Sequence, residues 1–261
     1  MRLRRLAARD ADPREYLAGA NAAFGSWGDE AMFAWVFRDD AELLLVDDDD
    51  AGRTVGGTAI LHRTLHSGGR AAIMGGSWTL PEARGRGVFT SMVEAIRAIA
   101  AERGAVFLAF VRRENASSRR FEALGAAMHP TFYCRSTVAS RYAVELEPLD
   151  PDPAMFPSSF RYTEDQWRAQ FLERPNARIE CVGRRGEWAA VVETSEDFDR
   201  VHAISDLAAL PLLAAHAHAC GRRLFWFATR RPEMECEWTE GFLAQLPAAA
   251  TEWELQNGDR M

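Results

Sequence analysis

A glycine-rich turn between an apolar strand and an amphipathic helix constrains this chain more than any other feature. The strand-like run ends at Pro81, and the turn that follows contains two arginines and two glycines. After the turn, apolar residues recur at the three- and four-residue spacing of one helix face. These residues are Val88, Phe89, Met92, Val93, Ile96 and Ile99. A helix that begins in this way exposes backbone N–H groups and the positive end of its dipole.

The residues of the turn suit a bound anion. Gly85 and Gly87 carry no side chain that would keep an anion away from the N–H groups. Arg84 and Arg86 add positive charge. The local chemistry therefore favours a binding site for pyrophosphate, although an Arg-Gly-Arg-Gly run can also be an ordinary exposed turn.

The next segments continue the pattern. Gly104 ends the helix, and residues 105–111 form an apolar run with the length and composition of a buried strand. A short helix is then expected between Asn115 and a glycine C-cap at Gly125.

Together these two motifs resemble the GNAT superfamily of acyl-CoA N-acyltransferases, over about residues 20–140. The phosphate motif of that family, Arg/Gln-x-x-Gly-x-Gly/Ala after a strand, corresponds to residues 84–89. The last position is Phe89, which departs from the strict pattern. Asn115 matches the asparagine that follows the next strand in the family.

The resemblance implies an acyl-CoA site, with acetyl-CoA as co-substrate and no metal. The pantetheine arm would lie between two splayed strands, residues 72–80 and 105–111, and pair with backbone groups of the first. N–H groups of the turn would hold the pyrophosphate, and the asparagine and a serine would face the far end of the arm. The residues assigned to the cofactor are Trp78, Thr79, Leu80, Arg84, Gly85, Arg86, Gly87, Val88, Phe89, Thr90, Asn115 and Ser118.

The resemblance also implies direct attack of an amine on the thioester carbonyl. Many relatives have a tyrosine that protonates the leaving thiolate, but the matching residue here is Phe121. Tyr133 is a candidate replacement and equally a candidate core aromatic. The strand before the turn has no carboxylate that could act as base. Asp206 in the second half is a candidate to orient the amine, although a helix cap is the favoured interpretation.

Beyond a Pro- and Asp-rich linker at residues 148–154, the order of elements begins again. A helix with an i, i+4 aromatic pair and two strands occur in both halves, with Phe33 and Phe37 in the first and Trp167 and Phe171 in the second. A strand at 201–207, a helix at 210–220, a strand at 224–229, a helix near 237–246 and a strand at 251–255 complete the second half. Its strand-to-helix turn has no glycine.

The expected fold is α/β (α+β), built from two GNAT-like halves, each a mixed, mainly antiparallel twisted sheet flanked by helices. Residues 1–147 would form the acyl-CoA-binding domain. Residues 155–261 would form a degenerate GNAT-like domain that shapes the acceptor cleft.

Other polar residues have structural interpretations. We expect His202 to be a packed core histidine and His216 and His218 to face different sides of a helix. The acidic run 47–50 lacks the ligand spacing of a calcium loop and is interpreted as a solvated hairpin turn.

Composition limits the class of protein. A net charge of −7 over 261 residues argues against a nucleic-acid surface and is compatible with a cationic acceptor. The cysteines form no Cys-x-x-Cys pair, so we expect them to be reduced and packed, as in a cytoplasmic protein. They are Cys134, Cys181, Cys220 and Cys236. No run approaches the length of a membrane span.

We therefore expect an N-acetyltransferase that transfers an acetyl or other acyl group to a primary amine of a small molecule. The alternative is a non-catalytic acyl-CoA-binding or regulatory protein. Another acyl group, or an oxygen or sulfur acceptor, would keep the same fold. The sequence leaves both a monomer and a homodimer open.

Overall fold

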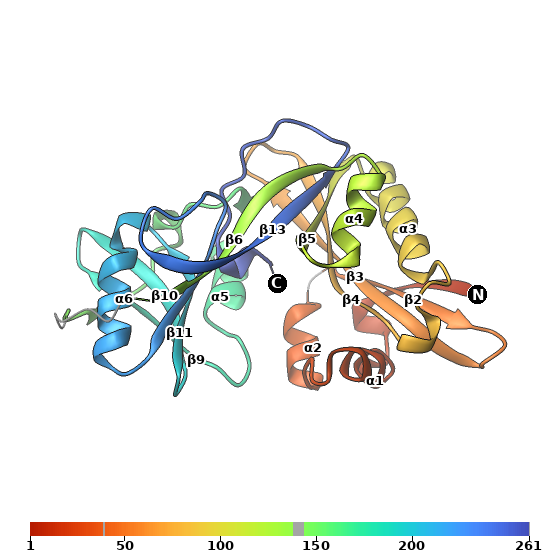
Figure 1. Cartoon of the computed structure of the whole chain (residues 1–261), viewed down its shortest axis with the longest axis horizontal. Helices are drawn as coiled ribbons and strands as arrows, with labels where there is room; N and C mark the ends of the chain where they lie inside the picture. Colours follow the sequence, from red (N-terminus) through yellow and green to blue (C-terminus); the bar gives the residue numbers. More distant parts are fainter. Residues whose placement is uncertain (39, 138–143, 261) are drawn as a thin grey trace. The chain divides into compact units, whose positions relative to one another are not determined.

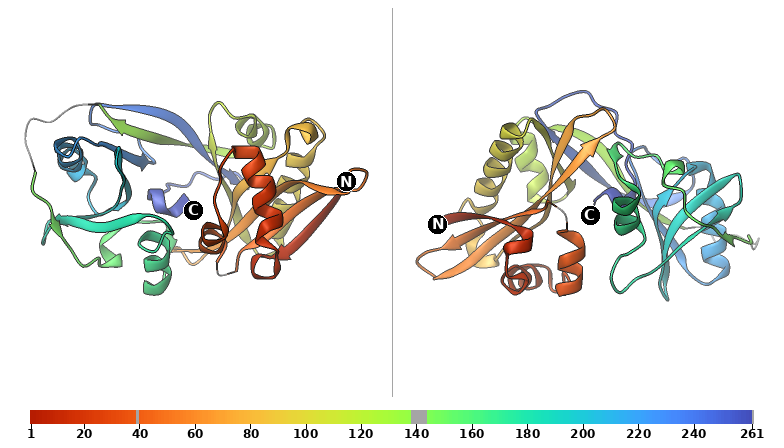
Figure 2. Two further views of the ribbon diagram at one scale, coloured as in Figure 1. Left: turned by 90° about the horizontal axis from the view of Figure 1, so that it is seen from below. Right: turned by 180° about the vertical axis from the view of Figure 1, so that it is seen from behind.

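The computed structural model describes all residues except 39, 138–143 and 261. Its contacts divide the chain into two compact units (Figures 1 and 2). The first comprises residues 1–111, 116–128 and 243–250, and the second comprises 112–115, 129–242 and 251–261. Each unit is described by itself.

In the first unit the strands lie in the order β1-β2-β3-β4-β5. Strand β13 comes next to β5, and its residues 243–246 belong to this unit. All described neighbours from β1 to β4 are antiparallel, and β4 and β5 are parallel. Helices α1 and α2 cover one face of this sheet and α3 and α4 the other (Figure 1). The elements are β1 Arg2–Ala7, α1 Pro13–Phe24, α2 Glu30–Val36, β2 Glu42–Asp48, β3 Arg53–Leu65, β4 Arg70–Thr79, α3 Val88–Glu102, β5 Ala105–Arg112 and α4 Ala116–Ala123.

The second unit contains the rest of β13 and then, in order, β6, β12, β11, β10, β9 and β7. Strands β11 and β12 are parallel, and they are connected through helix α6, as β4 and β5 are connected through α3. The elements are β6 Ala127–Ser136, β7 Glu147–Pro148, β8 Phe160–Arg161, α5 Glu164–Phe171, β9 Arg178–Arg184, β10 Trp188–Thr194, β11 Phe198–Ile204, α6 Leu210–Ala219, β12 Arg223–Ala228 and β13 Cys236–Leu246. The described residues also contain short 3₁₀ turns: η1 Ala8–Asp10, η2 Pro81–Ala83, η3 Pro153–Met155, η4 Leu207–Ala209 and η5 Asn257–Arg260.

Alternation along β10 explains how this sheet is buried on both faces. Trp188 and Ala190 belong to the core beneath α6, whereas Ala189 and Val191 belong to the core beneath α5. Successive strand residues point to opposite faces, so a continuous apolar run supplies both cores. The same strand–helix–strand unit thus occurs once in each half, which confirms the predicted repeat and the mixed, mainly antiparallel architecture.

The aromatic pairs expected on a helix of each half are also confirmed. The rings of Phe33 and Phe37 lie 5.0 Å apart, and those of Trp167 and Phe171 lie 5.1 Å apart. All four side chains are buried.

Three local expectations were wrong. Residues 237–246 form strand β13 rather than a helix, and residues 251–255 form no strand. Residues 147–148 form strand β7, which pairs with β9 at the edge of the sheet. Pro148 is tolerated there because an edge strand needs no donor on its outer side.

The cysteines are all free, as expected, but Cys220 is exposed rather than packed. It lies at the C-cap of α6, where the chain leaves the helix. No helix in the described part of the chain is long and apolar enough to cross a membrane.

Candidate functional site

Strands β4 and β5 separate partway along their length. Their parallel pairing runs from Arg70 and Ala105 to Met74 and Ala109 and stops there. Strand β4 continues for five more residues, to Thr79. This stretch keeps β3 on one edge and leaves its other edge without β5.

A bulge in β4 lies where the strands separate. Two residues, Gly76 and Ser77, stand opposite the single residue Thr58 of β3, and such an insertion bends the strand that carries it. The Thr58 hydroxyl donates to the carbonyl of Gly75 over 3.1 Å, and the hydroxyl of buried Tyr16 donates to the carbonyl of Gly76. Side chains from β3 and α1 therefore hold the bent segment in place.

The direction of the backbone at the end of β4 follows from one hydrogen bond. The N–H of Leu80 donates to the carbonyl of Val55 over 2.9 Å, so this residue faces β3. Because backbone groups alternate between the two edges of a strand, the N–H and carbonyl of Thr79 face the edge that β5 has left. Of the three residues predicted to pair with a pantetheine arm, Thr79 has the suitable orientation.

The Trp78 side chain has a structural role. Its indole is 3% exposed and lies directly over the Cα atoms of Gly19 and Gly57. A Cβ built at Gly19 would approach the ring to 2.0 Å, and one at Gly57 to 2.8 Å. These glycines are required by close packing against the indole, which fixes β4 against α1 and β3.

The turn after β4 leads into an uncapped helix. Gly85 has φ +77° and Gly87 has φ +83°, and a Cβ at either position would meet no atom within 4 Å. The glycines are therefore required by the left-handed backbone and not by lack of space. Gly87 is the N-cap of α3, where no side chain accepts a hydrogen bond and the first turn has no acid.

The first N–H groups of α3 consequently have no partner within the helix. They belong to Val88, Phe89 and Thr90, and α3 is 15 residues long. The sequence assigned the N–H groups of residues 84–89 to the pyrophosphate, but those of Arg84 and Arg86 already bond to the carbonyls of Pro81 and Ala83. The dipole of α3 adds partial positive charge at this end. The geometry suits a pyrophosphate, because backbone donors and positive potential meet where no side chain intrudes.

The two arginines of the turn differ. Arg84 is exposed and forms no ion pair with a described residue. Arg86 donates to Asp48 of β2 over 2.8 Å, and this contact lowers the pKa of the Asp48 carboxyl. The expectation of a solvated acidic hairpin was wrong for Asp47 and Asp48, which are buried and bonded to arginines. Sequence reasoning missed this anchor because the two segments are far apart in the chain.

Helix α4 explains both departures from the family pattern. Phe121 is 1% exposed, and its ring lies 5.7 Å from that of Phe107 and 6.2 Å from that of Phe89. Phe89 and Phe121, the two residues that depart from the family pattern, thus contact each other. Asn115 is exposed just before α4, and Ser118 is buried within it.

In the second unit a parallel strand pair also separates, but a side chain occupies the free strand edge. Pairing between β11 and β12 ends at Arg200 and Phe225, while β11 continues to Ile204. Both backbone groups of Ile204 bond to the side-chain amide of Gln256, each at 3.2 Å. This amide from the C-terminal segment occupies the strand edge that β12 has left.

The turn of the second unit is also unlike the first. Asp206 accepts a hydrogen bond from the N–H of Ala208 over 2.9 Å as the cap of η4, which confirms the structural interpretation of this residue. Asp206 is exposed. An acid at this position opposes binding of an anion.

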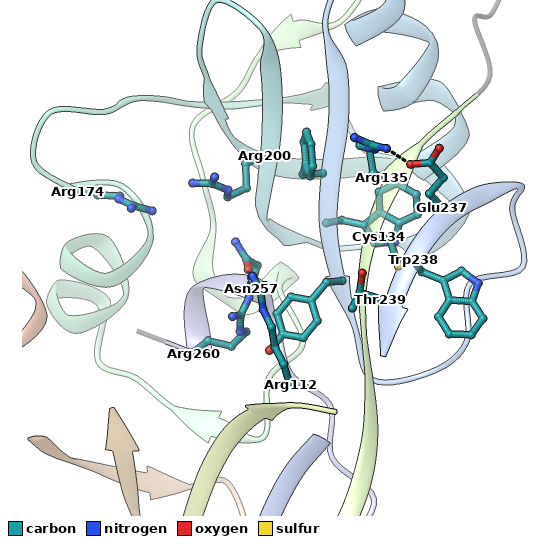
Figure 3. Close-up of a pocket in the computed structure, with 13 residues that line it drawn as sticks. Arg112, Cys134, Arg135, Arg174, Arg200, Glu237, Trp238, Thr239, Asn257 and Arg260 are labelled. Carbon is teal, nitrogen blue, oxygen red and sulfur yellow. Dashed lines mark hydrogen bonds and ion pairs between the residues drawn. The ribbon is translucent and has the colours of Figure 1, made fainter. Parts of the chain in front are cut away.

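Tyr133 lines a pocket of the second unit (Figure 3). It lies on β6, and its ring packs against the guanidinium of Arg260 at 4.4 Å and that of Arg112 at 5.7 Å. Asp206 does not line this pocket. Both predicted catalytic residues belong to the second unit, whereas the helix N-terminus that suits pyrophosphate belongs to the first.

Among the described residues there is no cluster of three or more His, Cys, Asp or Glu side chains that could hold a metal ion. His202 is 2% exposed and bonds to Glu193 over 2.7 Å, which confirms the packed interpretation. Burial lowers the pKa of His202 despite this acidic partner.

The first unit thus combines a separated parallel strand pair with an uncapped helix that begins after a glycine turn. The acetyltransferase (GNAT) family model matches residues 8–126, which contain both features. Over this segment, which is less than half of the chain, the sequence is similar to the GNAT family.

Solved structures share the fold of the whole chain. A probable N-acyltransferase from Enterococcus faecalis V583, titled a conserved protein of unknown function, is 10% identical, with a TM-score of 0.64 over 94% of this chain and 72% of its own. A putative acetyltransferase from Pyrococcus horikoshii is 11% identical, with a TM-score of 0.63 over 98% and 93%. The tandem GNAT protein from the clavulanic acid biosynthesis pathway is 13% identical, with a TM-score of 0.55 over 94% and 98%. No curated protein matched the sequence.

Proposed function

We propose that this chain is an N-acetyltransferase that moves an acetyl group from acetyl-CoA to a primary amine of a small molecule. One observation carries the proposal. Strand β4 has a free edge and is followed by helix α3, whose first N–H groups have no side-chain cap and whose N-cap is a left-handed glycine. The match of residues 8–126 to the acetyltransferase (GNAT) family model supports acyl transfer as the general reaction.

In this proposal the first half, residues 1–147, holds the co-substrate. The backbone of Thr79 pairs with the pantetheine arm, and the N–H groups of Val88, Phe89 and Thr90 bind the pyrophosphate. Arg84 supplies a guanidinium for the pyrophosphate, because Arg86 is already bonded to Asp48. Asn115 and Ser118 remain assigned to the far end of the arm.

The protein then contributes position more than acid–base chemistry. The amine attacks the thioester carbonyl and the carbon–sulfur bond breaks; the amine nitrogen loses a proton to water and the thiolate takes up a proton. Phe121 cannot supply that proton, because it has no hydroxyl and is packed between two rings. We assign the donor to Tyr133. Asp206 is engaged as a cap and is the weaker candidate for orienting the amine.

We assign residues 155–261 to shaping the acceptor cleft and place the single acyl-CoA site in the first half. Two observations support one site rather than two. The second strand separation is filled by Gln256, and its turn carries Asp206 in place of glycine and arginine. A cytoplasmic location and a small-molecule acceptor remain predictions from the sequence.

A non-catalytic acyl-CoA-binding protein is the second candidate. The observation that favours it is the buried phenylalanine at the family's tyrosine position, together with a β4 strand that contains no carboxylate. Such a protein would bind acyl-CoA at the same site but would not transfer the acyl group.

Two measurements separate the candidates. Calorimetry with acetyl-CoA measures binding, and thiol release in the presence of a panel of primary amines measures turnover. The enzyme proposal expects saturable binding and steady thiol release with at least one amine. Binding with no release above the uncatalysed rate across the panel favours the binding protein, and no binding at all refutes both.

A further inference from the structure

Two neighbouring strands of the second unit bring two free cysteines together. Cys134 lies on β6, and Cys236 is the first residue of β13, which is the next strand in the sheet. Both thiols are free. Cys134 belongs to the core beneath α6, and Cys236 packs against the same core. The two side chains therefore lie on the same face of the sheet.

A contact between two aromatic rings shows how β6 and β13 are aligned. The strands are antiparallel, because β6 runs from residues of the first unit into the second and β13 runs from the second into the first. The rings of Phe132 on β6 and Trp238 on β13 lie 5.3 Å apart. Two residues further along β6 and two residues back along β13 are Cys134 and Cys236. In an antiparallel pair this step keeps the face and places the two cysteines opposite each other.

The spacing of such a pair suits a disulfide. Opposite residues of antiparallel strands have Cα atoms about 4.5–5.5 Å apart. A disulfide joins Cα atoms that are about 4.4–6.8 Å apart. Bond formation between Cys134 and Cys236 therefore needs little movement of the backbone.

The two thiols differ in their access to solvent. Cys134 is 2% exposed, whereas Cys236 is half-buried at the start of its strand. Burial raises the pKa of both thiols; the hydrogen bond between them raises that of Cys134 further and acts to lower that of Cys236. Cys236 is therefore the thiol that a reagent in solution reaches first, and Cys134 is the thiol in contact with it.

We propose that Cys134 and Cys236 form a reversible modification site, at which a small organic disulfide oxidises the two thiols to a disulfide between β6 and β13. The Cys236 thiolate attacks one sulfur of the small disulfide, forms a mixed disulfide and releases one small thiol. Cys134 then attacks the sulfur of Cys236, and the second small thiol leaves. The protons of the two cysteines end on the two released thiols, so the protein loses two electrons and the reagent gains them.

The bond would fix one wall of the pocket of the second unit. Glu237 and Trp238 directly follow Cys236 and line this pocket (Figure 3). Residues 229–235, which precede Cys236, contain no helix or strand. The disulfide would join the end of this segment to β6. The proposal does not depend on acetyl transfer, because the two thiols react whether or not the chain turns over acetyl-CoA.

The test is incubation of the full chain with an excess of oxidised glutathione, followed by intact mass measurement and peptide mapping without reductant. Cys220 is exposed and can react by itself, so the parent chain carries Cys220→Ser. In this parent, Cys134→Ala and Cys236→Ala each remove one partner. Cys181→Ala is the matched control, because it removes another buried thiol of the same unit. Thermal unfolding of each variant establishes that it is folded.

We expect the parent chain to lose two hydrogen atoms in mass and its free thiols to fall from three to one. Peptide mapping should join Cys134 to Cys236, and dithiothreitol should restore both thiols. Cys181→Ala should form the same bond. Cys134→Ala should instead keep one glutathionyl group on Cys236, because no second thiol displaces it, and Cys236→Ala should leave Cys134 unmodified.

Three results would overturn the proposal. The first is a parent chain that keeps its mass and all its thiols in excess oxidised glutathione. The second is a parent chain that retains a glutathionyl group on Cys236 and forms no disulfide. The third is a bond that involves Cys181, or an equal loss of two hydrogen atoms in Cys134→Ala, which would place the reacting pair elsewhere. The parent measurement needs no substitution in the pair, so it decides the matter even if a variant does not fold.

Discussion

Replacing Gly87 by glutamate should abolish binding of acetyl-CoA while leaving the protein folded. The residue has φ +83° and a Cβ there meets no atom within 4 Å, so the cost to folding is the left-handed backbone alone. That cost is about 1–2 kcal/mol, against a typical stability of about 5–15 kcal/mol. The variant should therefore fold, with a modestly lower melting temperature.

The loss of affinity is larger because the new carboxylate faces the diphosphate. At a separation of about 5 Å, each pair of unit charges repels by about 1 kcal/mol in water and about 3 kcal/mol at the dielectric of a protein surface. Two charges on the diphosphate give about 2–6 kcal/mol, or roughly 30-fold to 10⁴-fold in the dissociation constant. Calorimetric titration with acetyl-CoA measures this change.

Two control variants separate strain from charge. Gly87→Ala carries the same backbone strain without the charge and should bind with a much smaller loss. Gly104→Glu has an equivalent left-handed glycine, φ +59° with an open Cβ position, at the other end of α3. It should be destabilised similarly and retain its affinity. Unchanged affinity in Gly87→Glu, or an equal loss in Gly104→Glu, would refute the assignment of the helix N-terminus as the anion seat.

Three further predictions follow from named contacts. Tyr133→Phe should lower kcat by about 10²-fold or more, the usual effect of a lost acid catalyst, with no change in acetyl-CoA affinity; an unaltered kcat removes Tyr133 as donor. Gly19→Ala should cost about 1–3 kcal/mol, since its Cβ would lie 2.0 Å from Trp78, and thermal unfolding that matches the unmodified chain would contradict this packing. Burial acts to raise the pKa of Glu193, but the hydrogen bond from His202 and two guanidiniums lower it from 4.5 to about 2. The stability that this acid contributes, about 3 kcal/mol, is present above pH 4.5 and lost as pH falls towards 2. Glu193→Gln should therefore unfold more readily than the unmodified chain at pH 7. If the difference in stability between the two proteins does not shrink as the pH falls towards 2, this account of Glu193 is wrong.

The parts of the fold that could be predicted depend on local chemistry. The apolar face of α3 and the glycine turn before it are read directly from spacing, because one helix face and one turn type determine those residues. Five predicted face residues, Val88, Met92, Val93, Ile96 and Ile99, are buried. The repeat was recognisable for the same reason, as each strand–helix–strand unit carries its own pattern.

The parts that could not be predicted depend on contacts between distant segments. Residues 237–246 read as a helix, yet they form β13 because neighbouring strands pair with them on both sides. Gly241 inside the run is unfavourable in a helix, and Trp238 and Thr239 favour a strand, which was the local signal available. The bond from Arg86 to Asp48 spans 38 residues, so no periodicity could reveal it.

The chain contains two copies of one strand–helix–strand unit, and their differences support our proposal that only the first copy binds an anion. In both copies a parallel strand pair separates, so separation alone does not define the site. The first copy adds a left-handed glycine cap with no acid, whereas the second has a capping aspartate and a glutamine that takes the free strand edge. Because the glutamine satisfies both backbone groups of Ile204, a pantetheine amide has nothing left to bond there. Under the proposed function, the difference between the open cofactor site of the first copy and the filled site of the second thus depends on a few polar side chains at strand ends and not on the arrangement of strands.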